Sequence, residues 1–248
     1  MSIKVLVGTL AATESEFLES RKSLLMQRDC EVNQYLIKDL NEYDAHNLLW
    51  TVFNRRAHTC DLIVKVDSDT VIKLPDSFKE VYANLVISKL DGVQLSLFDY
   101  FSQTSIYGVG FFLPHVQFKP SKNRLFADRA IDRKQYLIGQ NHDIGLSEDI
   151  GFHCKYPNEE QSYRYGLHRW KKGQFELLRS VLDHWWIEKD SARGWALVGA
   201  ILAEKKKLVS INYNGRTFNK MFTSLKTSAI LNEWVEENLD FLKRKLHR

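Results

Sequence analysis

The chain has 248 residues, of which 44% are hydrophobic and 27% are charged, and its formal net charge is +4. This length suits one large α/β domain or a domain with a helical extension, and folding can bury about 70–75% of the unfolded surface without disulfides or structural metals. The three cysteines are odd in number and show no C-x-x-C spacing, which excludes a zinc knuckle and a disulfide framework.

The charge also bears on partners and location. Nucleic-acid binding usually needs a stronger basic bias with interleaved aromatic residues, so we expect no nucleic-acid partner. A small positive excess suits anionic nucleoside diphosphates or an anionic membrane surface. The short apolar start is typical of a first strand rather than a secretory leader, and no apolar run approaches about 18 residues. We expect a cytoplasmic protein, in keeping with three widely spaced cysteines that suggest no disulfide framework.

The first part of the chain alternates short apolar runs with segments of helical periodicity. The predicted order is strand, helix, strand, helix, strand, over Ile3 to Thr9, Glu14 to Gln27, Val32 to Ile37, Asp44 to Ala57 and Leu62 to Val66. Such alternation predicts a parallel sheet with right-handed crossovers.

The pattern changes after Pro75. A helix is expected over Phe78 to Lys89, and the strands Gly92 to Phe98 and Ser105 to Leu113 are close enough in sequence to pair antiparallel, giving a mixed sheet. Weak, polar patterning from Pro114 to Gly151 indicates loops around a site.

The C-terminal part is expected to be mainly helical. Its predicted helices are Gln161 to Trp170, Gln174 to Trp186, Gly194 to Lys206 and Ser228 to Leu246. We therefore divide the chain into an α/β domain over residues 1–158 and a helical extension over 159–248.

Asp67 and Asp69 directly follow the strand Leu-Ile-Val-Lys-Val. Ligands of open α/β sheets bind beyond the carboxyl ends of strands, and two carboxylates there suit a hard divalent cation. A cation bound to them would neutralise charge on a leaving nucleoside diphosphate. Because Asp and Ser are also common in turns, the triplet alone does not distinguish a turn from a metal site. Its position after a β-α-β-α unit favours the metal site.

Residues 3–113 resemble the inverting family 2 glycosyltransferases of the GT-A fold. The resemblance lies in the N-terminal strand with its Thr9–Glu14 loop, the helix ending in Leu-Leu-Met-Gln, and the D-x-D strand. It implies a Rossmann-like mixed sheet and a hexosyltransferase that uses a UDP- or GDP-sugar with Mn²⁺ or Mg²⁺. It implies that Asp69 binds metal and diphosphate, with Asp67 beside the nucleotide and also available to the metal.

The resemblance also assigns donor-binding residues, which lie in the loop after the first strand, after the second strand and around the D-x-D triplet. They are Thr9, Leu10, Glu14, Asp39, Lys65, Asp67 and Ser68.

A second acidic cluster, Ser147-Glu148-Asp149-Ile-Gly-Phe-His153, resembles the family's Glu-Asp motif. An inverting transfer needs a carboxylate to accept the acceptor hydroxyl proton. Asp149 is the first candidate, followed by Glu148 and Asp143, although a solvated loop or helix cap would have the same composition. His153 is a candidate third metal ligand, since neutral imidazole binds divalent metals.

The segment from Gln161 to Trp170 resembles a variant of the Q-x-x-R-W signature, with Tyr165 in place of tryptophan. Arg164 could bind a phosphate through its guanidinium fork. The departure at Tyr165 and the missing membrane spans argue against a processive polysaccharide synthase. The expected acceptor is a glycan, lipid-linked or protein-linked hydroxyl.

Two other functions remain open from sequence. Asp67-Ser-Asp69-Thr-Val also fits the nucleophile motif of haloacid-dehalogenase-like phosphatases, with Asp67 as nucleophile, although that motif normally follows the first strand. The second alternative function is that of a catalytically inactive homologue that binds a glycan. The tryptophans and lysines of the helical part suit either packing onto the fold or a peripheral membrane contact. The oligomeric state is not predicted.

Overall fold

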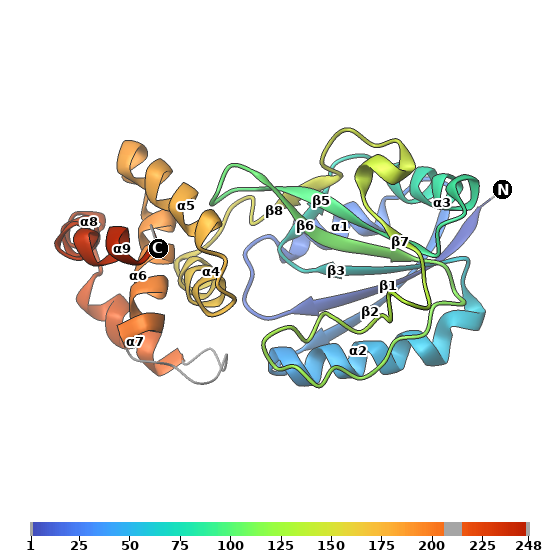
Figure 1. Ribbon diagram of the computed structural model, residues 1–248, viewed down its shortest axis with the longest axis horizontal. Helices are drawn as coiled ribbons and strands as arrows, with labels where there is room; N and C mark the ends of the chain where they lie inside the picture. Colours follow the sequence, from blue (N-terminus) through green and yellow to red (C-terminus); the bar gives the residue numbers. More distant parts are fainter. Residues whose placement is uncertain (1, 206–214, 247–248) are drawn as a thin grey trace. The chain divides into compact units, whose positions relative to one another are not determined.

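The structure is a computed structural model, and it describes residues 2–205 and 215–246. The chain forms two compact units, one of residues 1–100 and 104–156 and the other of residues 101–103 and 157–248. Figure 1 shows a mixed α/β sheet with flanking helices in the first unit and helices in the second. The predicted α/β class and the mainly helical C-terminal part are confirmed.

The first half of the α/β unit is a parallel β-α-β-α-β arrangement, as the sequence predicts. Strand β1 lies between β2 and β3 and pairs parallel with both. The elements are β1 (Ile3–Ala11), α1 (Phe17–Leu25), β2 (Cys30–Lys38), α2 (Glu42–Arg56), the 3-10 helix η1 (Ala57–Thr59) and β3 (Leu62–Asp67). Because β1 pairs with β2 as far as Ala11, the first strand extends two residues beyond its predicted end at Thr9, into the predicted Thr9–Glu14 loop.

The second half makes the sheet mixed. Strand β6 pairs antiparallel with both β3 and β5, and the order across the sheet is β2-β1-β3-β6-β5-β8-β4, with β7 paired to β5. The elements are β4 (Thr70–Ile72), α3 (Ser77–Ser88), β5 (Gly92–Asp99), β6 (Ser105–Phe112), β7 (Ile138–Gly139), the 3-10 helix η2 (Asn141–Ile144) and β8 (Gly151–His153). The three-residue strands β4 and β8 were not predicted.

Alternate residues of the central strands bury opposite faces of the sheet. In β3, Val64 packs in the core under α1 and α3, whereas Ile63 packs in the core under α2. Gly8 of β1 lets α2 approach closely, since a Cβ there would lie 2.2 Å from Leu49. Helices of this unit therefore cover both faces of the sheet (Figure 1).

The helical unit contains α4 to α9. Their bounds are α4 (Glu159–Lys171), α5 (Phe175–Glu188), α6 (Ser191–Lys205), α7 (Gly215–Ser224), α8 (Ser228–Glu237) and α9 (Leu239–Leu246). The single helix predicted over Ser228 to Leu246 is wrong, because it breaks at Asn238, and α7 was not predicted. Lys206, the last residue of the predicted third helix, lies outside the described residues.

The tryptophans of this unit mostly pack inside it. Trp185 and Trp195 are buried, whereas Trp186 is half-exposed at the end of α5. Among the described residues no helix is both long and apolar enough to cross a membrane. Peripheral membrane contact stays a prediction.

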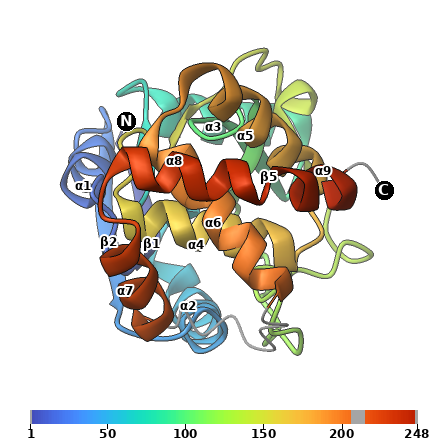
Figure 2. The same cartoon turned by 90° about the vertical axis from the view of Figure 1, so that its left-hand side faces the viewer.

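Helices α4 and α6 lie side by side with their backbones in contact (Figure 2). A Cβ on Gly166 would lie 1.6 Å from the carbonyl oxygen of Ala196, and a Cβ on Gly199 would lie 2.1 Å from that of Tyr163. Both neighbours are backbone atoms that cannot rotate away. The two glycines therefore set the separation of these helices.

We predict that Gly166→Ala lowers the free energy of unfolding by about 3 kcal/mol, because separating the helices outweighs the roughly 1 kcal/mol gained in helix propensity. Glu159→Ala, at an exposed position of the same helix, should change it by less than about 0.5 kcal/mol. Urea unfolding of both variants measures the difference. Equal stabilities would contradict the backbone contact.

Candidate functional site

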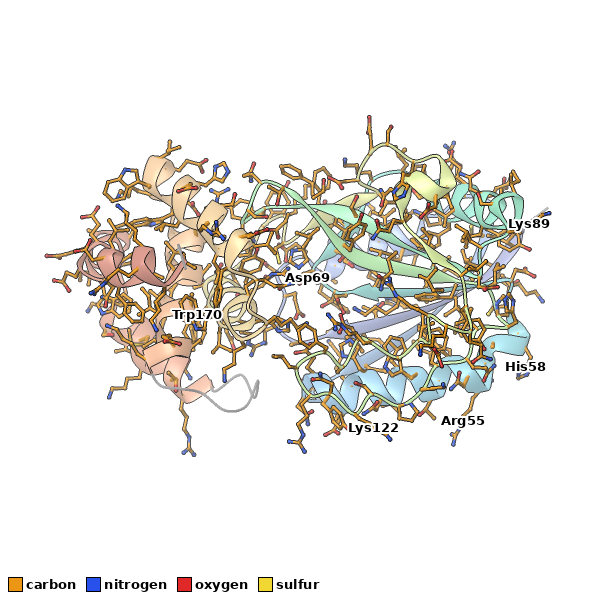
Figure 3. The ribbon with its side chains drawn as sticks, in the orientation of Figure 1. Arg55, His58, Asp69, Lys89, Lys122 and Trp170 are labelled. Carbon is orange, nitrogen blue, oxygen red and sulfur yellow. The ribbon has the colours of Figure 1, made fainter. Side chains whose placement is uncertain are left out.

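The acidic triplet forms a tight link between two strands of the sheet. Asp67 is the last residue of β3, Ser68 and Asp69 form the turn, and Thr70 begins β4. The backbone N–H of Ser68 donates to the carbonyl of Leu10 at 3.0 Å, which fixes the turn against the end of β1. Asp69 therefore lies just beyond the carboxyl end of β3 (Figure 3), where open α/β sheets bind ligands.

Strand β8 carries His153 to the same place. His153 is in register with Thr70 of β4 on one side and with Asp99, the last residue of β5, on the other. The backbone N–H of Cys154 then donates to the carbonyl of Asp69 at 2.9 Å. Three strands that are far apart in sequence thus bring one group of side chains together, here called the strand-end cluster: Asp69, Asp99, His153 and Cys154.

The contacts within the strand-end cluster are short. His153 Nδ1 lies 2.6 Å from Asp99 Oδ1, and His153 Nε2 lies 3.4 Å from Asp69 Oδ2. Asp69 Oδ1 is buried and has no hydrogen-bond partner among the described residues. A buried carboxylate oxygen without a partner is costly, so the cluster is incomplete as a set of protein–protein contacts.

Burial and charge oppose each other in this cluster. Burial by itself would raise the pKa of Asp69 and lower that of His153, but their attraction reverses both effects. The pKa of Asp69 is lowered by His153, and the pKa of His153 is raised well above 6.5 by Cys154, Asp69 and Asp99. In the metal-free protein His153 is therefore an imidazolium held between two carboxylates.

Lys65 and Asp67 form an ion pair beside the cluster, with Lys65 Nζ 2.6 Å from Asp67 Oδ2. Burial would lower the pKa of Lys65, yet the carboxylate of Asp67 raises it above its usual value. Nearby, burial and the charge of Lys65 lower the pKa of His46 to about 4, so this imidazole is neutral. Lys65 is thus a fixed positive charge next to the strand ends.

Glu14 connects the loop after β1 to the triplet. Its Oε2 accepts a hydrogen bond of 2.7 Å from Ser68 Oγ, and burial together with the nearby Asp69 raises its pKa. The loop and the turn are therefore joined, and Glu14 and Ser68 lie close to the strand-end cluster.

The other predicted donor-binding residues of this unit lie at strand ends. Thr9 is buried, and its Oγ1 accepts a hydrogen bond from Gln34 Nε2 at 2.9 Å. Leu10 is in register with Asp67 across β1 and β3. Asp39 follows β2, is exposed and adopts a left-handed conformation with φ 60°.

The three candidate bases lie before β8. Asp149 Oδ2 accepts from Ser105 Oγ at 2.9 Å, and its Oδ1 is buried without a hydrogen-bond partner among the described residues. Asp149 precedes His153 by four residues, which corresponds to about 13 Å of extended chain. Glu148 is exposed, and Asp143 Oδ2 accepts from the backbone of Gln140 to cap η2.

Arg164 lies on α4 of the helical unit and forms an ion pair with Glu160, one turn earlier on the same helix. Its predicted role in binding phosphate stays a prediction.

Sequence analysis missed Asp99 and Cys154. Asp99 is fully buried and ends β5, so the same signal that identified Asp67, an acidic residue closing an apolar strand, was present there. Cys154 adjoins His153, but a strand of three residues shows no periodicity that would predict its position.

No protein-family model matches the sequence, and neither does any curated protein. Solved structures do resemble the chain, among them the following three. A197 from STIV shares 14% identity with this chain at a TM-score of 0.35. The similar region covers 44% of this chain and 64% of A197.

The other two cover more of the chain. "Mannosyltransferase PcManGT from Pyrobaculum calidifontis in complex with GDP-Man and Mn2+" shares 14% identity at a TM-score of 0.43, covering 96% of this chain and 88% of that one. S. aureus TarS 1-349 shares 13% identity at a TM-score of 0.42, and the similar region covers 96% of this chain and 91% of that one. At this low similarity the functional argument rests on the residues themselves.

The raised pKa of His153 predicts how the stability of the metal-free protein depends on pH. The folded state keeps the imidazole proton above pH 6.5, where the unfolded chain loses it. The stabilisation is therefore complete below pH 6.5 and is lost as the pH rises through the folded pKa, at up to about 1.4 kcal/mol per pH unit.

Urea unfolding in the presence of a chelator, on both sides of pH 6.5, measures this effect. His153→Gln should remove that component of the pH dependence, and His58→Gln, at an exposed position, should retain it. A stability that rises with pH in the same range in the unmodified protein, and not in His153→Gln, would contradict the prediction.

Proposed function

We propose that the chain is a glycosyltransferase of the inverting, family 2 type, which moves a hexose from a nucleoside-diphosphate sugar to an acceptor hydroxyl. The acceptor is a glycan, a lipid-linked or a protein-linked group. The observation that carries the proposal is the meeting of Asp69 and His153 beyond the carboxyl end of a parallel strand, where Asp69 Oδ1 finds no hydrogen-bond partner among the residues that the structure describes.

The residues present fit a divalent metal. Asp69 and His153 would hold it, and Asp67 lies two residues from Asp69 on the same strand end with its side chain 40% exposed. Asp99 fixes the imidazole through Nδ1, an arrangement that recurs behind histidine metal ligands. When bound, the metal would neutralise negative charge on the diphosphate leaving group.

The surrounding residues suit the donor. Lys65 adds a fixed positive charge next to the site, and the hydrogen bond between Glu14 and Ser68 holds the loop after β1 beside the turn. We assign the diphosphate to the turn at Asp67 and Ser68. Leu10 and Asp39, at the ends of β1 and β2, are the proposed contacts to the base and ribose.

The proposed base is Asp149, whose Oδ2 is held by Ser105 and whose buried Oδ1 has no hydrogen-bond partner in the part of the chain that the structure describes. Asp143 is less suited, because it is engaged in capping η2. A donor and acceptor would have to extend from the strand ends toward Asp149 for this residue to act.

We predict that Asp69→Asn lowers metal-dependent hydrolysis of nucleoside-diphosphate sugars by about 10²–10³-fold, since a charged group that stabilises the leaving group is removed. Asp183→Asn, at an exposed position of α5, should have no effect. Release of nucleoside diphosphate with Mn²⁺, Mg²⁺ or chelator measures this. Normal turnover in Asp69→Asn, or phosphatase activity with phosphate trapped on Asp67, would contradict the proposal.

For Asp149→Asn we expect donor binding to be unchanged while sugar transfer falls by about 10²–10⁴-fold, the usual contribution of a general base. Calorimetry with the nucleotide sugar and a transfer assay separate the two. Glu148→Gln should retain transfer. If Asp149→Asn abolishes donor binding instead, Asp149 has a structural or donor-binding role.

Calorimetry with nucleoside diphosphates, with and without metal, also tests the proposal as a whole. An absence of binding under all conditions would favour the inactive glycan-binding homologue.

A further inference from the structure

Cys154 is held in the strand-end cluster by an unusual backbone conformation. It follows β8 directly and adopts φ 51°, in the left-handed region that residues with a Cβ rarely occupy. This turn carries the side chain back toward Asp69, where the thiol is buried with 2% exposure. Backbone strain of this kind costs about 1–3 kcal/mol and is concentrated at functional sites.

The ligand atoms of the cluster form a nearly equilateral triangle. Cys154 Sγ lies 3.5 Å from Asp69 Oδ2 and 3.6 Å from His153 Nε2, and the third side, from Asp69 Oδ2 to His153 Nε2, is 3.4 Å. Oxygen, nitrogen and sulfur at their usual distances from a tetrahedral zinc ion lie about 3.4–3.6 Å apart. The three atoms therefore already have the spacing of one face of a tetrahedral site.

Two further features fit a metal at this face. Asp99 binds His153 at Nδ1 and so leaves Nε2 directed at the other two ligand atoms. Asp69 Oδ1 is buried and lacks a partner among the described residues. The same short contacts also arise if the imidazolium and the thiol simply donate hydrogen bonds to Asp69, and the experiment must separate these cases.

We propose that Cys154 is the third protein ligand of an Asp–His–Cys metal site that binds Zn²⁺ in preference to Mg²⁺. Thiolate and imidazole ligands favour Zn²⁺, and Mg²⁺ requires oxygen ligands in octahedral geometry. Three protein ligands leave the fourth tetrahedral position open, as in catalytic zinc sites. Assigning that position to a diphosphate oxygen rests on the proposed function, whereas the ligand set does not.

The test uses Co²⁺ as a spectroscopic probe in the whole 248-residue chain. A thiolate ligand gives an intense near-ultraviolet charge-transfer band, which we expect in the unmodified protein and in Cys60→Ser, a half-buried control cysteine. Cys154→Ser should lose the band, and its Zn²⁺ affinity should fall at least about tenfold, the loss produced by removing even an outer-shell partner. Zn²⁺ should displace Co²⁺, and excess Mg²⁺ should not.

Zinc X-ray absorption on the unmodified protein makes the test independent of the folding of any variant. One sulfur at about 2.3 Å is expected. A zinc site with nitrogen and oxygen ligands alone, a cobalt band that survives in Cys154→Ser, or displacement of Co²⁺ by Mg²⁺ as readily as by Zn²⁺ would overturn the proposal.

Binding of nucleoside diphosphate distinguishes this proposal from the proposed function. If nucleoside diphosphate binds with Mn²⁺ or Mg²⁺ but no sulfur ligand is found, the Asp–His–Cys site is wrong and the glycosyltransferase proposal stands. If the sulfur ligand is found but no nucleoside diphosphate binds with Zn²⁺, Mn²⁺ or Mg²⁺, the metal site stands and the transferase proposal fails.

Discussion

The site depends on the pairing of β8 with both β5 and β4. In the register of these pairings His153 lies opposite Thr70 of β4 on one side and opposite Asp99 of β5 on the other. The backbone N–H of Cys154 donates a hydrogen bond of 2.9 Å to the carbonyl of Asp69, which holds Cys154 beside Asp69. Without β8 the acidic triplet would be a turn at the end of a strand, without the imidazole of His153 and the thiol of Cys154 beside it.

The electrostatics follow from this pairing. Asp99, fully buried, and Asp69, largely buried, are tolerated because an imidazolium lies between them, and their attraction outweighs the cost of burial. A divalent cation would take over this neutralising role, so proton and metal compete for the same ligand atoms. The metal-free and metal-bound proteins should therefore differ most in the number of protons that the cluster holds and little in backbone position.

In the helical unit, the close contact of α4 and α6 at Gly166 and Gly199 sets the separation of these two helices. Arg193 of α6, itself buried, donates from Nε to the carbonyl of Phe101 at 3.0 Å. Residues 101–103 thereby belong to the helical unit although their neighbours in sequence lie in the sheet. The chain thus passes between its two units at more than one point.

The sequence by itself determined the parallel β-α-β-α-β half, the antiparallel pairing of β5 and β6, and the position of Asp69 beyond β3. Those features depend on local hydrophobic periodicity, which runs of five or more residues display. Only the tertiary structure decided that Asp99 and Cys154 lie with Asp69 and His153, a pair that the family resemblance had already suggested. Strands β4 and β8 have three residues each, so their pairing comes from long-range hydrogen bonds that leave no periodic signal in the sequence.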